Sequence, residues 1–266
     1  MTRIIGIVLI KNEDLHIERV IRNVLNFCDE IIIADHQSED HSFEIVEALA
    51  REFPQISAKR IEHPNESHQA IQHLAGTPTW IFVIDGDEIY DPVGLVAMRK
   101  YLLEGRFDKD WNIFCNTLNC VAVDYKKKTA KGYLAPPSRA GARLFNFSII
   151  ESWTDCPERV HGGNLIFKPG YGPNLRRNLH QELGWENAYF RCVHVAFVQR
   201  SSHKKTGDGK GRLNPGEIEE LRKTKNWRHF PGYLKTLIKY WLGLDWKNQK
   251  YRRGELVEKD ISAFLT

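Results

Sequence analysis

The chain has 266 residues, of which 42% are hydrophobic and 27% charged, and its formal net charge is +4. This composition is sufficient for one substantial α/β core and excludes a disordered chain. The small positive charge argues against a nucleic-acid partner, and no run of about 20 apolar residues predicts a membrane span. The first residues enter a strand pattern directly, so we expect a cytoplasmic protein without a signal peptide. The 5 cysteines include no CxxC pair, which argues against a disulfide framework and a zinc knuckle.

Apolar stretches alternate with helical patterns through the N-terminal part of the chain. Strands that are each joined by a helix predict parallel pairing with right-handed crossovers. Asn12 is a candidate cap for the first helix, and Pro92 fits the first position of the fourth. The expected strands are residues 4–10, 31–34, 57–61 and 80–84, and the expected helices are 17–25, 43–50, a short segment after Asn65, and 92–104.

After residue 105 the pattern contains more strands and fewer helices. Residues 201–216 are rich in glycine and lysine and predict a flexible lid loop. We therefore divide the chain into an α/β half at 1–105, a second half of the same domain at 106–200, the loop, and C-terminal helices at 217–266. Strand-like stretches in the second half are residues 111–123, 142–147, 165–167 and 192–198.

Two carboxylates follow the fourth expected strand, where Asp85, Gly86, Asp87 and Glu88 end the apolar run 80–84. Ligands of open α/β sheets collect at the carboxyl ends of strands. A hard cation such as Mg²⁺ or Mn²⁺ prefers oxygen ligands and substrate phosphates. The spacing therefore indicates a metal-bridged diphosphate site. The alternative is an ordinary acidic turn, and the other strand ends must decide between the two.

Three motifs occur in one order at the ends of the expected strands: Lys11–Glu13, Asp35–Asp40 and Asp85–Glu88. Together they resemble the family 2 glycosyltransferases of the GT-A fold, of the bacterial surface-polysaccharide or lipopolysaccharide type. The resemblance covers about residues 4–105. It implies a Rossmann-like, mostly parallel central sheet with flanking helices, to which a C-terminal helical extension is added.

The resemblance also implies roles for individual residues. Asp35 matches the position that reads the nucleoside, and Asp85 with Asp87 matches the pair that binds sugar nucleotide and divalent metal, Mn²⁺ or Mg²⁺. Asn12 and Glu13 would shape the floor of the nucleotide pocket, although a helix cap is an equal alternative for Asn12. The implied reaction moves a sugar from a nucleotide-sugar donor, UDP-linked, to a glycan or lipid-linked acceptor.

The chain departs from the family pattern at several places. His36 and the pair His41-Ser42 replace the family's small residues near the nucleoside, and His68-Gln69 stands where the family often has Arg-Asn. The segment 160–162 resembles a Val-His-Glu motif, but Gly162 replaces its glutamate. These changes predict an altered donor pocket and leave His161 as a candidate for the acceptor pocket.

The second half holds the remaining candidates. Arg143, in a segment similar to the family's Arg-Leu-Phe strand, can meet a phosphate or pair with a structural carboxylate. His194 can complete the metal shell, as a late histidine does in several GT-A enzymes, or can be a core histidine. Lys204 and Lys205 can close over the diphosphate and screen it from water, or can be solvated loop charges.

An inverting transferase needs a carboxylate that deprotonates the acceptor hydroxyl. The candidates are Asp155 and Glu158, with Glu182 behind them, whereas a retaining enzyme needs no base there. The aromatic and basic tail at 227–247 has the make-up of an interfacial helix, which would place the protein peripherally at the inner face of the membrane. Core packing or a dimer interface would explain the same pattern.

Two other functions compete with the transferase. The apolar strand before Asp85 and Asp87 also resembles the nucleophile motif of haloacid-dehalogenase-like phosphohydrolases. That motif belongs to the first strand of its domain, whereas three strand-helix units precede it here. A non-catalytic relative that binds a nucleotide sugar or a glycan is the third possibility. We expect the metal-dependent glycosyltransferase, acting in cell-surface polysaccharide synthesis.

Overall fold

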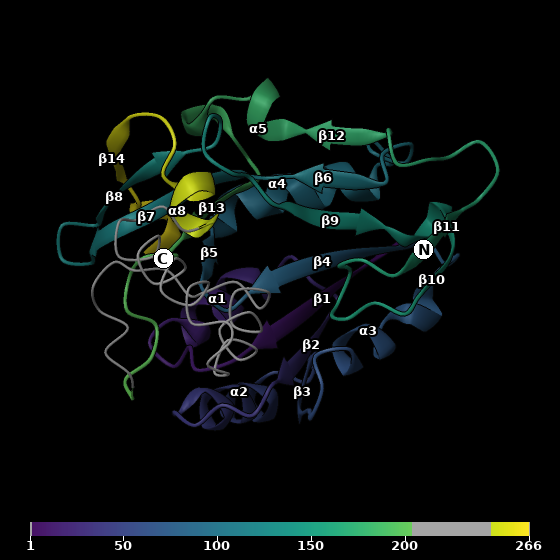
Figure 1. Ribbon diagram of the computed structural model, residues 1–266, viewed down its shortest axis with the longest axis horizontal. Helices are drawn as coiled ribbons and strands as arrows, with labels where there is room; N and C mark the ends of the chain where they lie inside the picture. The colour runs from purple at the N-terminus through teal and green to yellow at the C-terminus, as the bar shows by residue number, and fades with distance from the viewer. Residues whose placement is uncertain (1, 204–245, 266) are drawn as a thin grey trace, which may run out of the picture.

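The computed structural model of the chain describes residues 2–203 and 246–265. Its main sheet has the strand order β12-β6-β9-β4-β1-β2-β3 (Figure 1). Neighbours among β1 to β4 are parallel, and β9 is antiparallel to both β4 and β6. This mixed, mostly parallel sheet confirms the α/β, Rossmann-like class. Its strands are β1 (Arg3–Ile10), β2 (Glu30–Asp35), β3 (Ile56–Arg60), β4 (Thr79–Asp85), β6 (Asn112–Phe114), β9 (Ala142–Asn146) and β12 (Arg176–Asn178).

The central strands are apolar along their whole length because both faces of the sheet are covered. On one face Val8 and Phe82 belong to a core that also includes the buried sides of the long helices. On the other face Ile7 and Val83 pack with Trp153 of a hairpin. The helices are α1 (Ile17–Val24), α2 (Ser42–Glu52), α3 (Glu66–Gln69), η1 (Gln72–Leu74) and α4 (Pro92–Leu103), and the hairpin is β10 (Ile150–Thr154) with β11 (Asn164–Phe167).

The predicted start of α4 is confirmed, whereas the predicted cap of α1 is wrong. The Asp91 side chain accepts from the N–H groups of Val93 and Gly94, with Pro92 at the start of α4 as expected. Asn12, in contrast, does not cap α1, whose N-cap residue is His16. The backbone of Asn12 is left-handed, with φ of 57°, and the chain makes a further turn before the helix begins.

A second sheet has the order β14-β8-β7-β13-β5. Only Gly86 and Asp87 separate β4 from β5, so the two sheets meet at the acidic motif. The short α5 (Leu179–Glu182) and η3 (Trp185–Asn187) precede β13. The strands are β5 (Glu88–Tyr90), β7 (Asn116–Asp124), β8 (Thr129–Leu134), β13 (Arg191–His194) and β14 (Leu256–Asp260).

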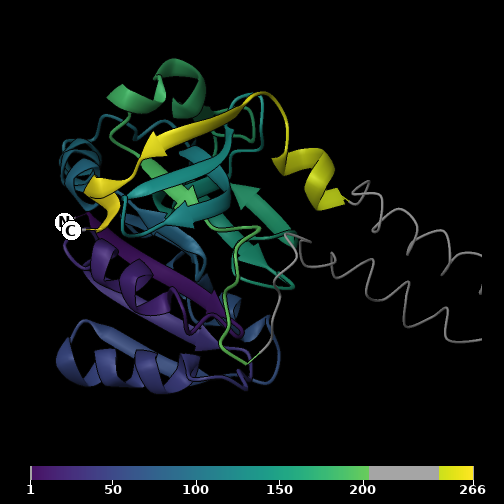
Figure 2. The same cartoon turned by 90° about the vertical axis from the view of Figure 1, so that its left-hand side faces the viewer.

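The prediction that residues 217–266 are helical is wrong for the end of the chain. Residues 246–251 form α8 (Trp246–Tyr251), but β14 pairs antiparallel with β8 (Figure 2) and is followed by η5 (Ser262–Leu265). The edge of β8 offers unpaired backbone groups, and exposure along β14 alternates with a period of two, as a strand requires. The expected helices at 217–245 and most of the expected lid loop, 204–216, lie outside the described residues.

None of the helices within residues 2–203 and 246–265 is both long and apolar enough to cross a membrane. All five cysteines are buried and free.

Candidate functional site

The carboxyl ends of β1, β2 and β4 lie side by side because β1 pairs with both other strands in parallel. The register opposes Ile10 to Asp35 and Leu9 to Asp85. The chain leaves β1 toward β2 on one side, and β4 returns on the other side. This reversal of strand order is where open α/β sheets bind ligands. The topology thus brings the three sequence motifs to one edge.

Asp35 lies at the end of β2 and is fully buried, with 0% exposure. Its Oδ2 accepts from the N–H of Ser38 at 3.1 Å and lies 3.7 Å from Nε of Arg60. Its Oδ1 is buried and has no hydrogen-bond partner among the described residues. An unpaired buried acceptor costs about 1–3 kcal/mol, so this oxygen is suited to an N–H or O–H group of a ligand.

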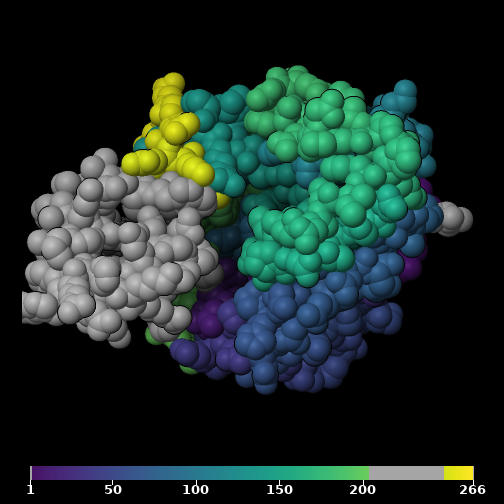
Figure 3. All heavy atoms as spheres, turned by 45° about the vertical axis from the view of Figure 1, so that its right-hand side comes forward, coloured from purple at the N-terminus to yellow at the C-terminus, as the bar shows by residue number. Residues whose placement is uncertain are grey.

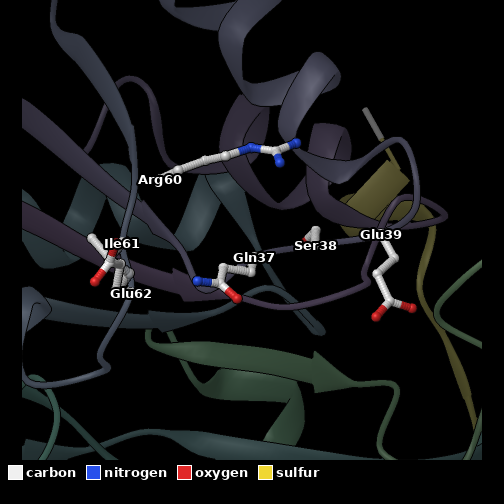
Figure 4. Close-up of a pocket in the computed structure, with 6 residues that line it drawn as sticks. All are labelled: Gln37, Ser38, Glu39, Arg60, Ile61 and Glu62. Atoms are coloured by element: carbon white, nitrogen blue, oxygen red, sulfur yellow. The ribbon is translucent and has the colours of Figure 1, made fainter.

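A cavity of about 560 Å³ opens next to Asp35, lined in part by Ser38 and Arg60, the two residues that contact its carboxylate. In Figure 4, Arg60 lies above Gln37, Ser38 and Glu39. The Arg60 guanidinium is also placed over the ring of Phe43, 4.4 Å from its centroid. The cavity is therefore lined by groups of both charge signs, and the Arg60 guanidinium packs on the Phe43 ring.

Asn12 and Glu13 connect the loop after β1 to the loop after β2. The Asn12 N–H donates to Ser38 Oγ at 3.0 Å, and Asn12 Oδ1 accepts from the Glu39 N–H at 2.8 Å. The Glu13 N–H donates to Ser42 Oγ at 2.7 Å. These bonds hold the two loops together beside the cavity, a role that replaces the helix cap considered for Asn12.

Asp85, the first carboxylate of the acidic motif, is held by two buried arginines. Nη2 of Arg143 lies 2.8 Å from Asp85 Oδ2, and Nη1 of Arg159 lies 2.5 Å from Oδ1. Burial alone would raise the pKa of Asp85, but Arg143 and then Arg159 outweigh it and hold the pKa below its ordinary value. Of the two roles considered for Arg143, the structure contains the pairing with carboxylates.

Glu88 is the second carboxylate partner of Arg143 and also accepts from the Tyr90 hydroxyl at 2.8 Å. Burial raises the pKa of Glu88 to about 7, despite the opposing effect of Arg143. Gly86 lets the ends of β1 and β4 approach closely, because a Cβ at this position would lie 2.0 Å from Oε2 of Glu13, whose side chain would have to move. The motif therefore depends on close contact between the ends of β1 and β4.

Asp87, the second carboxylate of the motif, contacts two cationic or potentially cationic groups. Its Oδ2 pairs with Nη1 of Arg200, and its Oδ1 lies 3.6 Å from Nε2 of His194. Arg200 Nη1 is also 3.5 Å from Oε1 of Glu13. The structure thus brings His194 to the acidic motif, as expected, and adds Arg200, which the sequence had not indicated.

The orientation of the His194 ring is fixed by Asn119 of β7. The Asn119 amide nitrogen donates to Ser138 Oγ at 2.8 Å and to the Arg139 carbonyl at 3.0 Å. Its Oδ1 must therefore accept from Nδ1 of His194, 2.8 Å away. In the neutral ring this leaves the lone pair of Nε2 on the side of Asp87. The sequence did not single out Asn119, because Asn116, Thr117 and Asp124 are also polar residues of β7.

The donor atoms of Asp87 and His194 fit a divalent cation that keeps further positions open. A carboxylate oxygen and a neutral imidazole nitrogen together suit Mn²⁺ better than Mg²⁺. Within residues 2–203 and 246–265, no group of three or more histidine, cysteine or acidic side chains forms a metal site. This pair is consistent with a cation shared with phosphate oxygens of a bound substrate.

The hairpin loop between β10 and β11 approaches the acidic motif through Arg159. Glu158 Oε1 lies 3.1 Å from Arg159 Nη2 and 3.3 Å from His161 Nδ1. Asp155 instead accepts from Asn164 at 2.8 Å, within the hairpin. Among the candidates for the catalytic base, Glu158 is therefore the one that pairs with Arg159, which in turn contacts Asp85 of the acidic motif. Figure 3 shows a hollow on this side of the molecule.

The other residues singled out from the sequence either do not contact the acidic motif or lie outside the described residues. Glu182 pairs with Arg177 at 3.4 Å, an interaction outside the acidic motif. Gly162, which replaces the family's glutamate, has φ of 69°, a left-handed conformation that favours glycine. Lys204 and Lys205 lie outside the described residues.

His68, one of the departures from the family pattern, holds the Arg159 segment in place. Its ring nitrogens face the backbone carbonyls of Arg159 and Trp153, the latter at 2.8 Å. The neighbouring Ser67 Oγ accepts from the Arg159 N–H at 2.9 Å. Thus α3 positions the arginine that contacts Asp85.

Part of the chain matches a known protein family. Residues 7–116 match the model of the family described as glycosyl transferase family 2. The matched range includes the ends of β1, β2 and β4 and therefore all three motifs. The match supports a GT-A glycosyltransferase of family 2 for this part of the chain. No match was found among curated proteins.

Solved structures are similar to parts of the chain at low identity. TarS of S. aureus is 16% identical over 56% of this chain and 29% of its own, with a TM-score of 0.40. The mannosyltransferase PcManGT of Pyrobaculum calidifontis, solved with GDP-Man and Mn²⁺, is 13% identical over 96% of this chain and 66% of its own, with a TM-score of 0.41. This chain thus spans less than a third of TarS. These similarities carry no argument about activity.

Proposed function

We propose that the protein is a metal-dependent glycosyltransferase that moves a sugar from a UDP-linked donor to a glycan or lipid-linked acceptor in cell-surface polysaccharide synthesis. One observation carries the proposal. At the end of the sheet where the strand order reverses, the unpaired Oδ1 of Asp35 and the cavity beside it lie on one side of β1, and the acidic motif of Asp85 and Asp87 lies on its other side. A nucleoside and a diphosphate need these two neighbouring environments.

Each part of the donor has a partner in the proposed complex. Asp35 accepts from an N–H group of the base, and the diphosphate lies toward Asp87 and His194. A divalent cation bound there would neutralise charge that develops on the leaving diphosphate. Arg143 and Arg159 keep Asp85 ionised, which maintains the negative charge of the motif.

Glu158 is the base that we propose for an inverting transfer. Its side chain is 35% exposed, so an acceptor hydroxyl can approach it. The hydroxyl proton moves to the Glu158 carboxylate while the acceptor oxygen bonds to the anomeric carbon of the sugar. The bond from that carbon to the phosphate oxygen breaks, and its electron pair leaves with the nucleoside diphosphate.

The phosphohydrolase alternative fits the geometry less well. In that reading Asp85 would be a nucleophile that attacks a phosphate. Two buried arginines occupy both oxygens of its carboxylate, and β4 is not the first strand of the sheet. No observation in the structure favours that reaction.

The proposal is tested by thermal stabilisation with UDP, GDP, CDP and ADP, each with and without Mn²⁺. At about 100 times Kd, UDP with Mn²⁺ should stabilise the protein by about 2.7 kcal/mol, a Tm increase of roughly 5–10 °C. Asp87→Asn should abolish the metal-dependent part of this increase. If none of the nucleotides stabilises the wild type, with or without Mn²⁺, the proposed function is wrong.

A variant of Asp35 and a matched control test the proposed nucleoside pocket. Asp35→Asn should weaken UDP binding by about 10- to 150-fold, because one hydrogen bond to a charged group is worth about 1.5–3 kcal/mol. Asp29→Asn is the control, since Asp29 accepts from the Ile4 N–H and pairs with Arg99 just before the opposite end of β2. Equal UDP affinity in the wild type and Asp35→Asn would remove Asp35 from the site.

A further inference from the structure

The Arg200 side chain pairs with Asp87, the carboxylate that a divalent metal would need as a ligand. This side chain is buried, with 6% exposure for the residue, and Nη1 pairs with Oδ2 of Asp87 while lying 3.5 Å from Oε1 of Glu13. The side chain therefore joins the ends of β1 and β4 across the point where we place the donor diphosphate. It supplies a positive charge to both acids.

The backbone of Arg200 is fixed independently of these ion pairs. Its carbonyl accepts from the Leu15 N–H at 3.1 Å. The next residue, Ser201, donates through Oγ to Asp40 at 2.6 Å, and the Ser202 N–H donates to Asp14 at 2.8 Å. We call residues 199–203 the strap. Because the strap is held by groups other than Asp87 and Glu13, the guanidinium can change partners without detaching the backbone.

A divalent cation and the Arg200 guanidinium compete for the same carboxylate. Two like charges about 4 Å apart repel by about 4 kcal/mol at the dielectric constant typical of partly buried sites, per unit of charge on each. The diphosphate removes this conflict, because its anionic oxygens accept from a guanidinium in bidentate geometry. Only when the nucleotide is present does Arg200 thus have an anionic partner that can replace Asp87.

We propose that Arg200 is an exchangeable counter-cation: it neutralises Asp87 while the donor site is empty and transfers to the diphosphate when the metal takes Asp87. This inference rests on the proposed function. It predicts that Mn²⁺ alone binds weakly and that Mn²⁺ and nucleoside diphosphate strengthen each other's binding. Arg200 is then a positioning residue that couples the two ligands.

The test is a titration of the full chain with Mn²⁺, in which free Mn²⁺ is measured by electron paramagnetic resonance with and without UDP. In the wild type, UDP should increase Mn²⁺ affinity by about 5- to 150-fold, the usual range of such coupling. Arg200→Gln should bind Mn²⁺ alone more tightly by at least about 5-fold and should lose most of the coupling to UDP. Arg200→Lys keeps the positive charge but loses the bidentate donor geometry of the guanidinium. Its Mn²⁺ affinity and its coupling to UDP should therefore lie between those of the wild type and Arg200→Gln.

Arg191→Gln is the matched control. Arg191 also pairs with a buried carboxylate, Asp91, at 2.9 Å, but this pair lies at the start of α4. Its loss should lower stability without changing Mn²⁺ affinity. If Arg200→Gln does not fold, Arg200→Lys carries the test, and unchanged Mn²⁺ affinity in it overturns the inference.

The outcomes separate this inference from the proposed function. Wild-type coupling that persists unchanged in Arg200→Gln, or Mn²⁺ affinity in that variant no higher than in the wild type, overturns the role of Arg200 alone. A wild type that responds to no nucleotide refutes the proposed function instead. Absence of Mn²⁺ binding in both wild type and Arg200→Gln also overturns the inference, because removal of the competing cation should expose Asp87.

Discussion

Asn119 illustrates how one amide controls the chemistry of a neighbouring side chain. Its two donor bonds leave only its oxygen for His194, so the histidine presents Nε2 to Asp87. Partners of this kind orient metal-binding histidines and raise their basicity. Asn119 is therefore expected to influence the metal site without contacting the metal.

Replacement of Asn119 by alanine should weaken Mn²⁺ binding in the presence of UDP by about 10- to 100-fold, because the His194 ring loses its fixed orientation. Calorimetric titration of Mn²⁺ measures this change. Asn116→Ala is the control on the same strand, since Asn116 donates to the Leu183 carbonyl at 2.7 Å and has no contact with His194. Equal losses in both variants would mean that Asn119 acts only through stability.

At the residue scale, the sequence predicted which side chains lie near one another where the signal was local. Asp35, Asp85 and Asp87 each follow an apolar strand, and the structure places them at one edge of the sheet. Arg200 was missed because its partners are remote in the chain: its bond to Asp87 spans 113 residues. No spacing rule links positions at that separation, so only the folded chain reveals the pair.

At the scale of elements, the strap is attached to the start of α1 through His16. Nε2 of His16 lies 2.9 Å from the Gln199 carbonyl, and Nδ1 lies 3.0 Å from the Tyr125 hydroxyl. A neutral ring satisfies both contacts when Nε2 carries the proton and Nδ1 accepts from Tyr125. Burial lowers the pKa of His16 below its ordinary value of 6.5, which favours this neutral form.

The stability of the protein should consequently depend on pH through His16. Below pH 6.5, the ordinary pKa of this group, the unfolded chain binds a proton that the folded chain does not bind. The free energy of unfolding should therefore fall as the pH falls from 6.5 toward the folded-state pKa, by at most about 1.4 kcal/mol per pH unit. Urea unfolding between about pH 5.5 and 7.5 should show a smaller decrease for His16→Gln than for the wild type.

His73→Gln serves as the control for this pH dependence, because His73 is exposed in η1. It should follow the wild-type profile. A difference in unfolding free energy between wild type and His16→Gln that stays constant over the whole pH range would show that His16 does not titrate differently in the folded state.

Elements were predictable to the extent that burial imposes a simple period. Strands β1 and β4 are covered on both faces and read as continuous apolar runs, so their limits were found within a few residues. Strand β14 was missed because none of its residues is fully buried and its partner, β8, is remote in the chain: Leu256 pairs with Tyr133. Its sequence becomes a strand only because the second sheet offers an edge.

At the scale of the whole molecule, the end of the chain is packed against its beginning. The Asn23 amide nitrogen in α1 donates to the carbonyls of Tyr90 and Phe264 at 2.8 and 2.9 Å. The Phe264 ring stacks on Trp185 with 5.7 Å between centroids. One helix of the main sheet, one strand of the second sheet and the C-terminal segment thus share a single core, which predicts that both sheets unfold together.

Phe264→Ala tests this cooperativity because Phe264 is 1% exposed and belongs to the main core. Loss of a buried phenylalanine should reduce the free energy of unfolding by about 3–5 kcal/mol. Leu256→Ala is the matched control in the same segment, where a side chain of 50% exposure should contribute less than about 0.5 kcal/mol.

Urea unfolding followed at two tryptophans shows whether both sheets share this core. Trp80 reports on the main sheet and Trp185 on the contact with the C-terminal segment, so each can be followed separately in variants with tryptophan replaced elsewhere. If the two sheets form one unit, Phe264→Ala shifts both signals to the same lower urea concentration. If the Trp185 signal moves alone, the second sheet unfolds independently. The acidic motif between β4 and β5 would then join two units of different stability, and ligands that bind Asp87 would stabilise both.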